Sequence, residues 1–136
     1  MDGTDSQDVF ISNWEYDQAP ESQDHIKIDK RYGLFIDGKI EEPKSKKYFQ
    51  TTDPANGKVL AKVAEASETD VDRAVKAARK AFKKWSDLPA KERGKYIFRI
   101  ARLIQERARE LAVIESLDGG KPIRESRDID IPLAAN

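Results

Sequence analysis

Residues 51–66, TTDPANGKVLAKVAEA, and residues 115–122, ESLDGGKP, bound the stretch of the sequence that decides the fold. Within the first segment, Asp53-Pro54 and Asn56-Gly57 are dipeptides that favour turns. YFQTT before this turn and VLAKVAEA after it are typical of short extended segments. The stretch therefore predicts two short strands joined by a turn, and two amphipathic helices follow.

The first helix is predicted to begin after Ser67. Ser67 and Asp70 have the spacing of a capping box, in which each residue satisfies a free backbone N–H of the other. Apolar residues then recur every three or four positions, which places them on one face of a helix. They are Val71, Ala74, Val75, Ala78, Phe82 and Trp85. Ser86-Asp87-Leu88-Pro89 is predicted to end this helix and start the next.

The second helix is predicted to run from Pro89 to about Leu117 as one core helix with a broad apolar face. Gly94 lies within it and hints at close packing, because glycine costs roughly 1 kcal/mol relative to alanine in a helix. Asp118-Gly119-Gly120 ends the helix, since glycine readily adopts the left-handed conformation after a last turn. Residues 123–136 are expected to start a third helix.

Upstream, LFIDGKI predicts a hairpin, because Asp37-Gly38 between apolar residues is a favoured two-residue turn. Residues 1–30 form an acidic extension that is predicted not to fold alone. It is either a flexible leader or an arm whose Phe10 and Trp14 dock on a neighbouring surface. His25 lies among polar residues.

Composition restricts the classes of function. The chain has 136 residues, 25 basic and 25 acidic residues, one histidine and no cysteine. This is the size of one domain. Balanced charge argues against partners chosen by net charge.

No apolar run approaches the roughly 18 residues that cross a bilayer, so we expect a cytoplasmic protein without a membrane partner. Thiol nucleophiles, disulfides and multi-histidine metal clusters are excluded.

Two non-enzymatic alternatives remain. RKAFKKW and KERGKYIFR interleave cations with aromatic residues, as in nucleic-acid binding. We favour a solvated helix face for these cations. Phe82 and Trp85 have the spacing of the apolar face that is predicted to be buried, and acidic residues elsewhere cancel the positive charge. The other alternative is a non-catalytic helical module that binds another protein through its apolar stripe.

The order LFIDGK, a charged turn, residues 51–82, Trp85 and residues 92–122 resembles the NAD(P)-dependent aldehyde dehydrogenases. The resemblance covers residues 34–136 and implies an α/β protein with a Rossmann-type nucleotide-binding domain. Residues 31–136 would be the N-terminal part of that domain, comprising hairpin strands, a helical hairpin and the start of a third helix.

The resemblance also implies the chemistry of the family. Its members oxidise aldehydes to acids with NAD or NADP and assemble as homo-oligomers. A cysteine thiolate attacks the aldehyde, hydride leaves for the cofactor, and a glutamate activates water to hydrolyse the thioester. None of these groups maps onto this chain, and its glycines contain no phosphate-binding cluster. We therefore expect these 136 residues to be inactive alone, without catalytic or cofactor-binding residues.

The resemblance implies one site in this segment. Some family members bind structural sodium or potassium with two main-chain carbonyls and a carboxylate at a helix end. The corresponding residues here are Thr51, Thr52 and Asp118. Oxygen ligands with a single carboxylate suit a singly charged hard cation. The alternative is that Asp118 only forms local hydrogen bonds.

Overall fold

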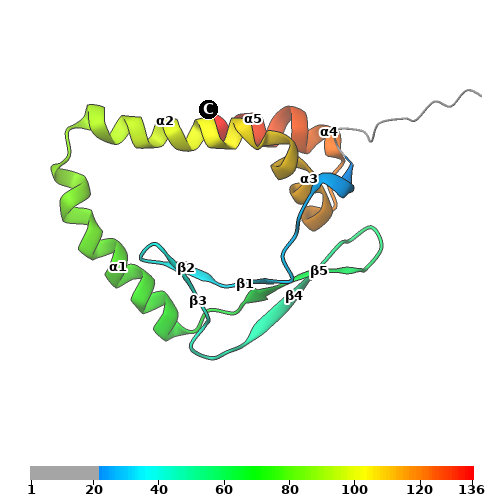
Figure 1. Ribbon diagram of the computed structural model, residues 1–136, viewed down its shortest axis with the longest axis horizontal. Helices are drawn as coiled ribbons and strands as arrows, with labels where there is room; N and C mark the ends of the chain where they lie inside the picture. Colours follow the sequence, from blue (N-terminus) through cyan, green and yellow to red (C-terminus); the bar gives the residue numbers. More distant parts are fainter. Residues whose placement is uncertain (1–21) are drawn as a thin grey trace, which may run out of the picture.

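The computed structural model describes residues 22–136, which form an open frame of two small sheets and a chain of helices (Figure 1). The strands are β1 (Arg31–Tyr32), β2 (Leu34–Ile36), β3 (Lys39–Glu41), β4 (Tyr48–Thr52) and β5 (Val59–Ala64). The helices are η1 (Gln23–His25), α1 (Glu68–Asp87), α2 (Ala90–Glu106), α3 (Ala108–Gly119), α4 (Ile123–Glu125), η2 (Ser126–Asp130) and α5 (Ile131–Ala135). Phe10 and Trp14 lie outside the described residues.

The strands form two sheets. β4 pairs antiparallel with β5, and β1 pairs parallel with the other edge of β5. β2 and β3 form the predicted hairpin, in which Asp37 and Gly38 have φ values of 51° and 77°. Positive φ at both central residues is the geometry that Asp-Gly turns favour. The parallel strand β1 was not predicted, and it is preceded by a backbone bond from Lys62 N–H to the Lys30 carbonyl.

The first helix, α1, forms as predicted, with Ser67 and Asp70 in a reciprocal capping box. Asp70 is its only buried residue. The apolar stripe of the helix remains exposed among the described residues, with Val71 at 54% and Phe82 at 66% exposure. A stripe of this period that lacks a partner indicates an incomplete core.

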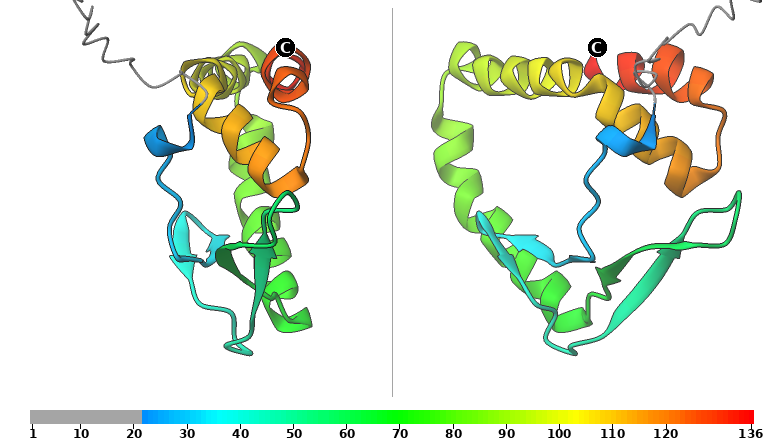
Figure 2. Two further views of the ribbon diagram at one scale, coloured as in Figure 1. Left: turned by 90° about the vertical axis from the view of Figure 1, so that its right-hand side faces the viewer. Right: turned by 45° about the vertical axis from the view of Figure 1, so that its right-hand side comes forward.

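The prediction of one helix from Pro89 to Leu117 is wrong. The helix breaks at Arg107, whose φ and ψ of −104° and 18° separate α2 from α3. The two helices then diverge (Figure 2). α2 lies beside α5 and buries no residue, whereas α3 buries Ala112, Val113 and Leu117. A straight helix could not reach both sets of partners. Gly94 has open space around it among residues 22–136, so close packing does not explain it there.

Residues 123–135 are helical, as expected for the start of a third helix, but they include the π-helical turn η2. Pro132 follows this turn and has no N–H to donate to it. Buried Ser126 of η2 lies 3.3 Å from Ser116 of α3, hydroxyl oxygen to hydroxyl oxygen. The C-terminal helices therefore pack back on α3 and α2.

The apolar core within residues 22–136 is small. It consists of Ile36, Ala61, Ala64, Ala112, Val113, Leu117 and Ala135. Larger side chains such as Phe35, Ile40 and Leu133 are 70% exposed or more. In the part of the chain that the structure describes, no helix combines the length and apolar character needed to span a membrane.

Candidate functional site

The candidate site lies where the end of β4 meets the last turn of α3. The Thr51 hydroxyl donates a hydrogen bond to the carboxylate of Asp118, which is 67 residues away in the sequence. Thr51 is half-buried, and Asp118 is exposed at the helix end. The fold thus brings two of the three residues predicted to bind a cation into side-chain contact.

The turn after β4 fixes the position of Thr51. The buried Asp53 carboxylate accepts hydrogen bonds from Ala55 N (2.8 Å) and Asn56 Nδ2 (2.7 Å). The Asn56 amide oxygen accepts in turn from Lys58 N at 2.8 Å. These side chains replace the missing backbone partners of the turn, as Asp and Asn commonly do. The end of β4 is therefore held by a dense local network.

The end of α3 packs on this turn through Gly120. Gly120 has φ of 70°, and its N–H donates to the Ser116 carbonyl at 3.0 Å. A Cβ placed on Gly120 would lie 3.1 Å from Pro54 Cβ, which is closer than ordinary contact. Only glycine satisfies both the left-handed cap and this approach. The Gly120 cap therefore places Asp118 against Thr51.

Thr51 and Asp118 also line a small cavity of about 160 Å³ between the sheet and α3. Its other walls are mostly apolar, namely Ile28, Tyr32, Leu60, Ala61, Val63 and Ile114. Asp118 is therefore the only charged residue among those that line this space.

This geometry does not test the cation site, which stays a prediction. The structure joins Thr51 to Asp118 through the threonine hydroxyl, whereas the predicted ligands of Thr51 and Thr52 are main-chain carbonyls. Thr52 follows directly in β4, next to an irregularity in its pairing with β5. Within residues 22–136, no three His, Cys, Asp or Glu side chains are grouped as a metal site. A single carboxylate among neutral oxygens fits a monovalent cation better than a divalent one.

A second polar centre links α1 to the β2–β3 hairpin. The buried Asp70 carboxylate accepts from Ser67 N (3.0 Å), Ser67 Oγ (2.7 Å) and Lys44 N (3.1 Å). Arg73 bridges Asp70, at 3.2 Å, to Glu41. The hydrogen bond from the Ser67 side chain is the main cause that lowers the pKa of Asp70. The hydrogen bond with Glu41 likewise raises the pKa of Arg73.

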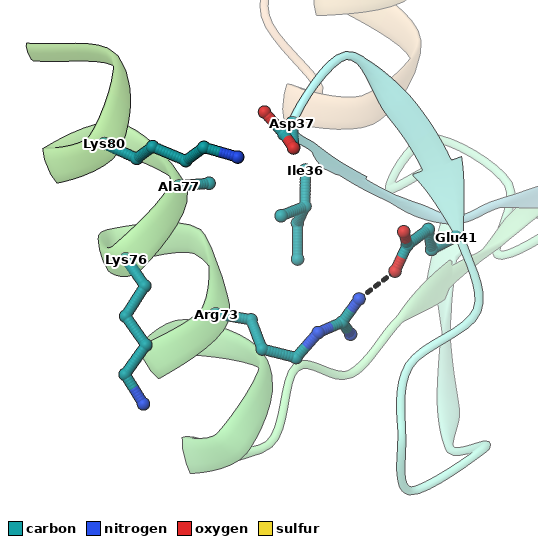
Figure 3. Close-up of a pocket in the computed structure, with 7 residues that line it drawn as sticks. All are labelled: Ile36, Asp37, Glu41, Arg73, Lys76, Ala77 and Lys80. Atoms are coloured by element: carbon teal, nitrogen blue, oxygen red, sulfur yellow. Dashed lines mark hydrogen bonds and ion pairs between the residues drawn. The ribbon is translucent and has the colours of Figure 1, made fainter.

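The side chains of Glu41 and Arg73 face an open pocket of about 310 Å³ (Figure 3). Lys76 and Lys80 extend from α1 on the same wall, and Asp37 lies across from them. Arg73 pairs with the carboxylates of both Asp70 and Glu41. This polar centre therefore fixes the β2–β3 hairpin on α1. The capping box predicted Ser67 and Asp70, but no local signal identified Glu41 or Lys44 as partners.

The structure thus combines short strands and helices that meet at a fixed turn with broad apolar faces that lack partners within residues 22–136. Comparisons with known proteins specify the class. Residues 40–136 match the model of the aldehyde dehydrogenase family. The chain belongs to that family.

Three relatives illustrate the match. DhaS of Bacillus subtilis (strain 168), a curated relative assigned to the aldehyde dehydrogenases, is 46% identical over 103 residues, which are 74% of this chain and 21% of DhaS. The NAD+ complex of a Bacillus cereus aldehyde dehydrogenase is 41% identical with a TM-score of 0.76, covering 79% of this chain and 22% of the other. An NAD-dependent aldehyde dehydrogenase from Sinorhizobium meliloti is 40% identical with a TM-score of 0.74, covering 79% and 22%.

The chain thus spans about a fifth of the length of these relatives. The family membership and the α/β fold that the sequence predicted are confirmed. The family consists of oxidoreductases, and its solved members include complexes with NAD.

Proposed function

We propose that this chain is the N-terminal segment of an NAD(P)-dependent aldehyde dehydrogenase that oxidises a small-molecule aldehyde to a carboxylic acid through a cysteine thioester. The observation that carries this proposal is the family match over residues 40–136, joined to 41% identity with an NAD+-bound relative. NAD or NADP supplies the hydride acceptor in such a reaction. The intact enzyme is further proposed to be a homo-oligomer in the cytoplasm.

Residues 31–136 would act as a scaffold for the nucleotide-binding domain. The apolar stripe of α1 and the face of α2 have no partner within residues 22–136. In a protein about five times as long, these faces would be covered by later chain. Their burial would orient α1 and α2 against the domain without placing any of their side chains on the substrate.

The proposed chemistry requires a thiolate, and these 136 residues contain no cysteine. We therefore expect no aldehyde-dependent reduction of NAD or NADP by a polypeptide of this length. The same absorbance assay on the product of the complete coding region should show turnover. Turnover by the 136-residue polypeptide itself would refute the assignment of the nucleophile to later chain.

We further propose that Thr51, Thr52 and Asp118 hold sodium or potassium. The contact between Thr51 and Asp118 supports this proposal, as does the low charge of the oxygen set. A bound ion would fix the end of α3 on β4. The test is the thermal midpoint of the product of the complete coding region in potassium, sodium or choline chloride at equal ionic strength.

Binding at ten times Kd should stabilise the fold by about 1.4 kcal/mol. Asp118→Asn should abolish the difference between the salts. Asp87→Asn serves as the matched control, because Asp87 is also an exposed aspartate at the end of a helix. Equal midpoints in all three salts for the unaltered protein would exclude the cation site.

The alternative function, a helical module that binds another protein, is also compatible with the exposed apolar faces. It predicts a discrete, cooperatively melting helical oligomer of the 136-residue chain. The scaffold proposal instead predicts aggregation or a partly unfolded monomer. Size-exclusion chromatography and circular dichroism distinguish the two.

A further inference from the structure

The turn between β4 and β5 contains Asn56-Gly57, a dipeptide that can modify itself. Asparagine is a chemically labile residue, above all before glycine, which has no side chain to hinder its own nitrogen. The Gly57 nitrogen attacks the side-chain carbonyl carbon of Asn56, and the new carbon–nitrogen bond closes a succinimide ring. The side-chain nitrogen leaves as ammonia and takes the proton of the Gly57 N–H. Water then opens the ring to aspartate or isoaspartate, so the net change is deamidation.

In the folded turn, each group that takes part in this reaction is held by a hydrogen bond. The Gly57 N–H donates to the Asp53 carbonyl at 2.7 Å. Asn56 Nδ2, the nitrogen that would leave, donates to the Asp53 carboxylate at 2.7 Å. The side-chain oxygen of Asn56 accepts from Lys58 N at 2.8 Å. Ring closure would have to break the first of these bonds and turn the side chain away from its other two partners.

These hydrogen bonds all lie within residues 53–58, so later chain need not supply any of them. The carboxylate of buried Asp53 is fixed by a further hydrogen bond from Ala55 N at 2.8 Å. The Asp53 N–H closes the turn on the Lys58 carbonyl at 2.9 Å, and Gly57 has φ of 71°. The Gly57 nitrogen can therefore react only when the turn opens, and the rate of deamidation should follow the open fraction.

The product of the reaction cannot rebuild the same turn. A carboxylate at position 56 has no hydrogen to donate to Asp53, and it adds a second negative charge beside that residue. Isoaspartate also adds a methylene group to the main chain. Pro54 of this turn packs against Gly120 at the end of α3. We propose that Asn56 is a deamidation site that the folded turn protects, and that its reaction after a local opening loosens the end of α3 from the turn.

Peptide mapping of the product of the complete coding region tests this proposal. Trypsin releases residues 48–58, in which Asn56 is the only asparagine, and mass spectrometry detects the conversion of its amide to a carboxylate. The protein and the free peptide of residues 48–58 are incubated in the same mildly alkaline buffer. Asn56 should deamidate at least about tenfold more slowly in the folded protein, which corresponds to an opening free energy of about 1.4 kcal/mol or more.

The variant Asp53→Asn removes the carboxylate oxygen that holds the Asn56 amide but keeps an oxygen for Ala55 N. It should raise the rate of deamidation in the folded protein about tenfold, equivalent to about 1.4 kcal/mol. The same substitution should leave the rate in the free peptide unchanged. Asp72→Asn, on the exposed side of α1, is the matched control and should not change either rate. Thermal unfolding checks that both variants remain folded.

A second pair of variants tests the effect of the product on the turn. Asn56→Asp should lower the thermal midpoint, because two carboxylates then face each other. Asn56→Asp combined with Asp53→Asn exchanges the amide and the carboxylate, so a donor again meets an acceptor, and this variant should recover most of the loss. Three results would overturn the proposal: equal rates in the folded protein and the free peptide, no acceleration by Asp53→Asn, or no recovery in the exchanged variant.

Discussion

At the residue scale, Asp70 is the buried charge on which the junction of α1 with the hairpin depends. Its pKa is lowered, chiefly by the hydrogen bond from Ser67. A carboxyl whose pKa is lower in the folded state stabilises the fold above its unfolded pKa, about 3.9. That stability is lost as the pH falls through the lower folded pKa. Protonation of Asp70 should therefore weaken the junction in acid.

We expect Asp70→Asn to lower the thermal midpoint at neutral pH, because a neutral amide cannot accept all of these donors as a carboxylate does. The difference in thermal midpoint between the variant and the unaltered protein should become smaller below about pH 4, where the aspartate of the unfolded chain binds its proton. Asp72→Asn is the control, since Asp72 is exposed and, within residues 22–136, pairs only with Lys76 at 3.0 Å. If this difference in thermal midpoint stayed constant down to acid pH, the charge of Asp70 would not be the cause of its stabilising effect.

At the element scale, we expect opposite changes in stability when alanine replaces a glycine at the end of α3 and one within α2. Gly120→Ala should destabilise the protein by about 1–2 kcal/mol, because alanine is disfavoured at positive φ and its Cβ would crowd Pro54. Gly94→Ala should stabilise the chain by about 0.5–1 kcal/mol, since alanine is the better helix former and the space is open.

Thermal or urea unfolding of the two variants measures this difference. Both substitutions add one methyl group, so Gly94→Ala is the matched control for Gly120→Ala. Equal effects would contradict the close packing of the α3 cap on the turn after β4. If Gly94→Ala destabilised a longer form of the protein only, later chain would be shown to pack against α2 at that position.

The elements that the sequence predicted are those with a local cause. Asp37-Gly38, the Ser67–Asp70 box and Gly120 each act through their own backbone, so their residue types reveal them. The break at Arg107 has no glycine or proline to mark it and follows from what α2 and α3 pack against. β1 is two residues long and depends on pairing with distant β5. The candidate site followed from family resemblance, because no local pattern links Thr51 to Asp118.

At the scale of the whole molecule, the described core is uneven. α3 and β5 together contribute five of its seven buried apolar residues, Ala61, Ala64, Ala112, Val113 and Leu117. α2 contributes none, and the only buried residue of α1 is Asp70. Local stability depends on buried contacts, so we expect α1 and α2 to unfold locally before α3 and β5 do.

Hydrogen exchange of the 136-residue chain should show this order directly. Amides of α3 and β5 should have protection factors about tenfold or more above those in the middle of α1 and α2, a difference of about 1.4 kcal/mol. In a longer polypeptide that includes the rest of the family fold, protection in α1 and α2 should rise to match α3, because later chain would then bury Phe82 and the exposed face of α2. Uniform protection in the 136-residue chain would mean that these faces find partners without added chain, and would favour the interaction module over the scaffold.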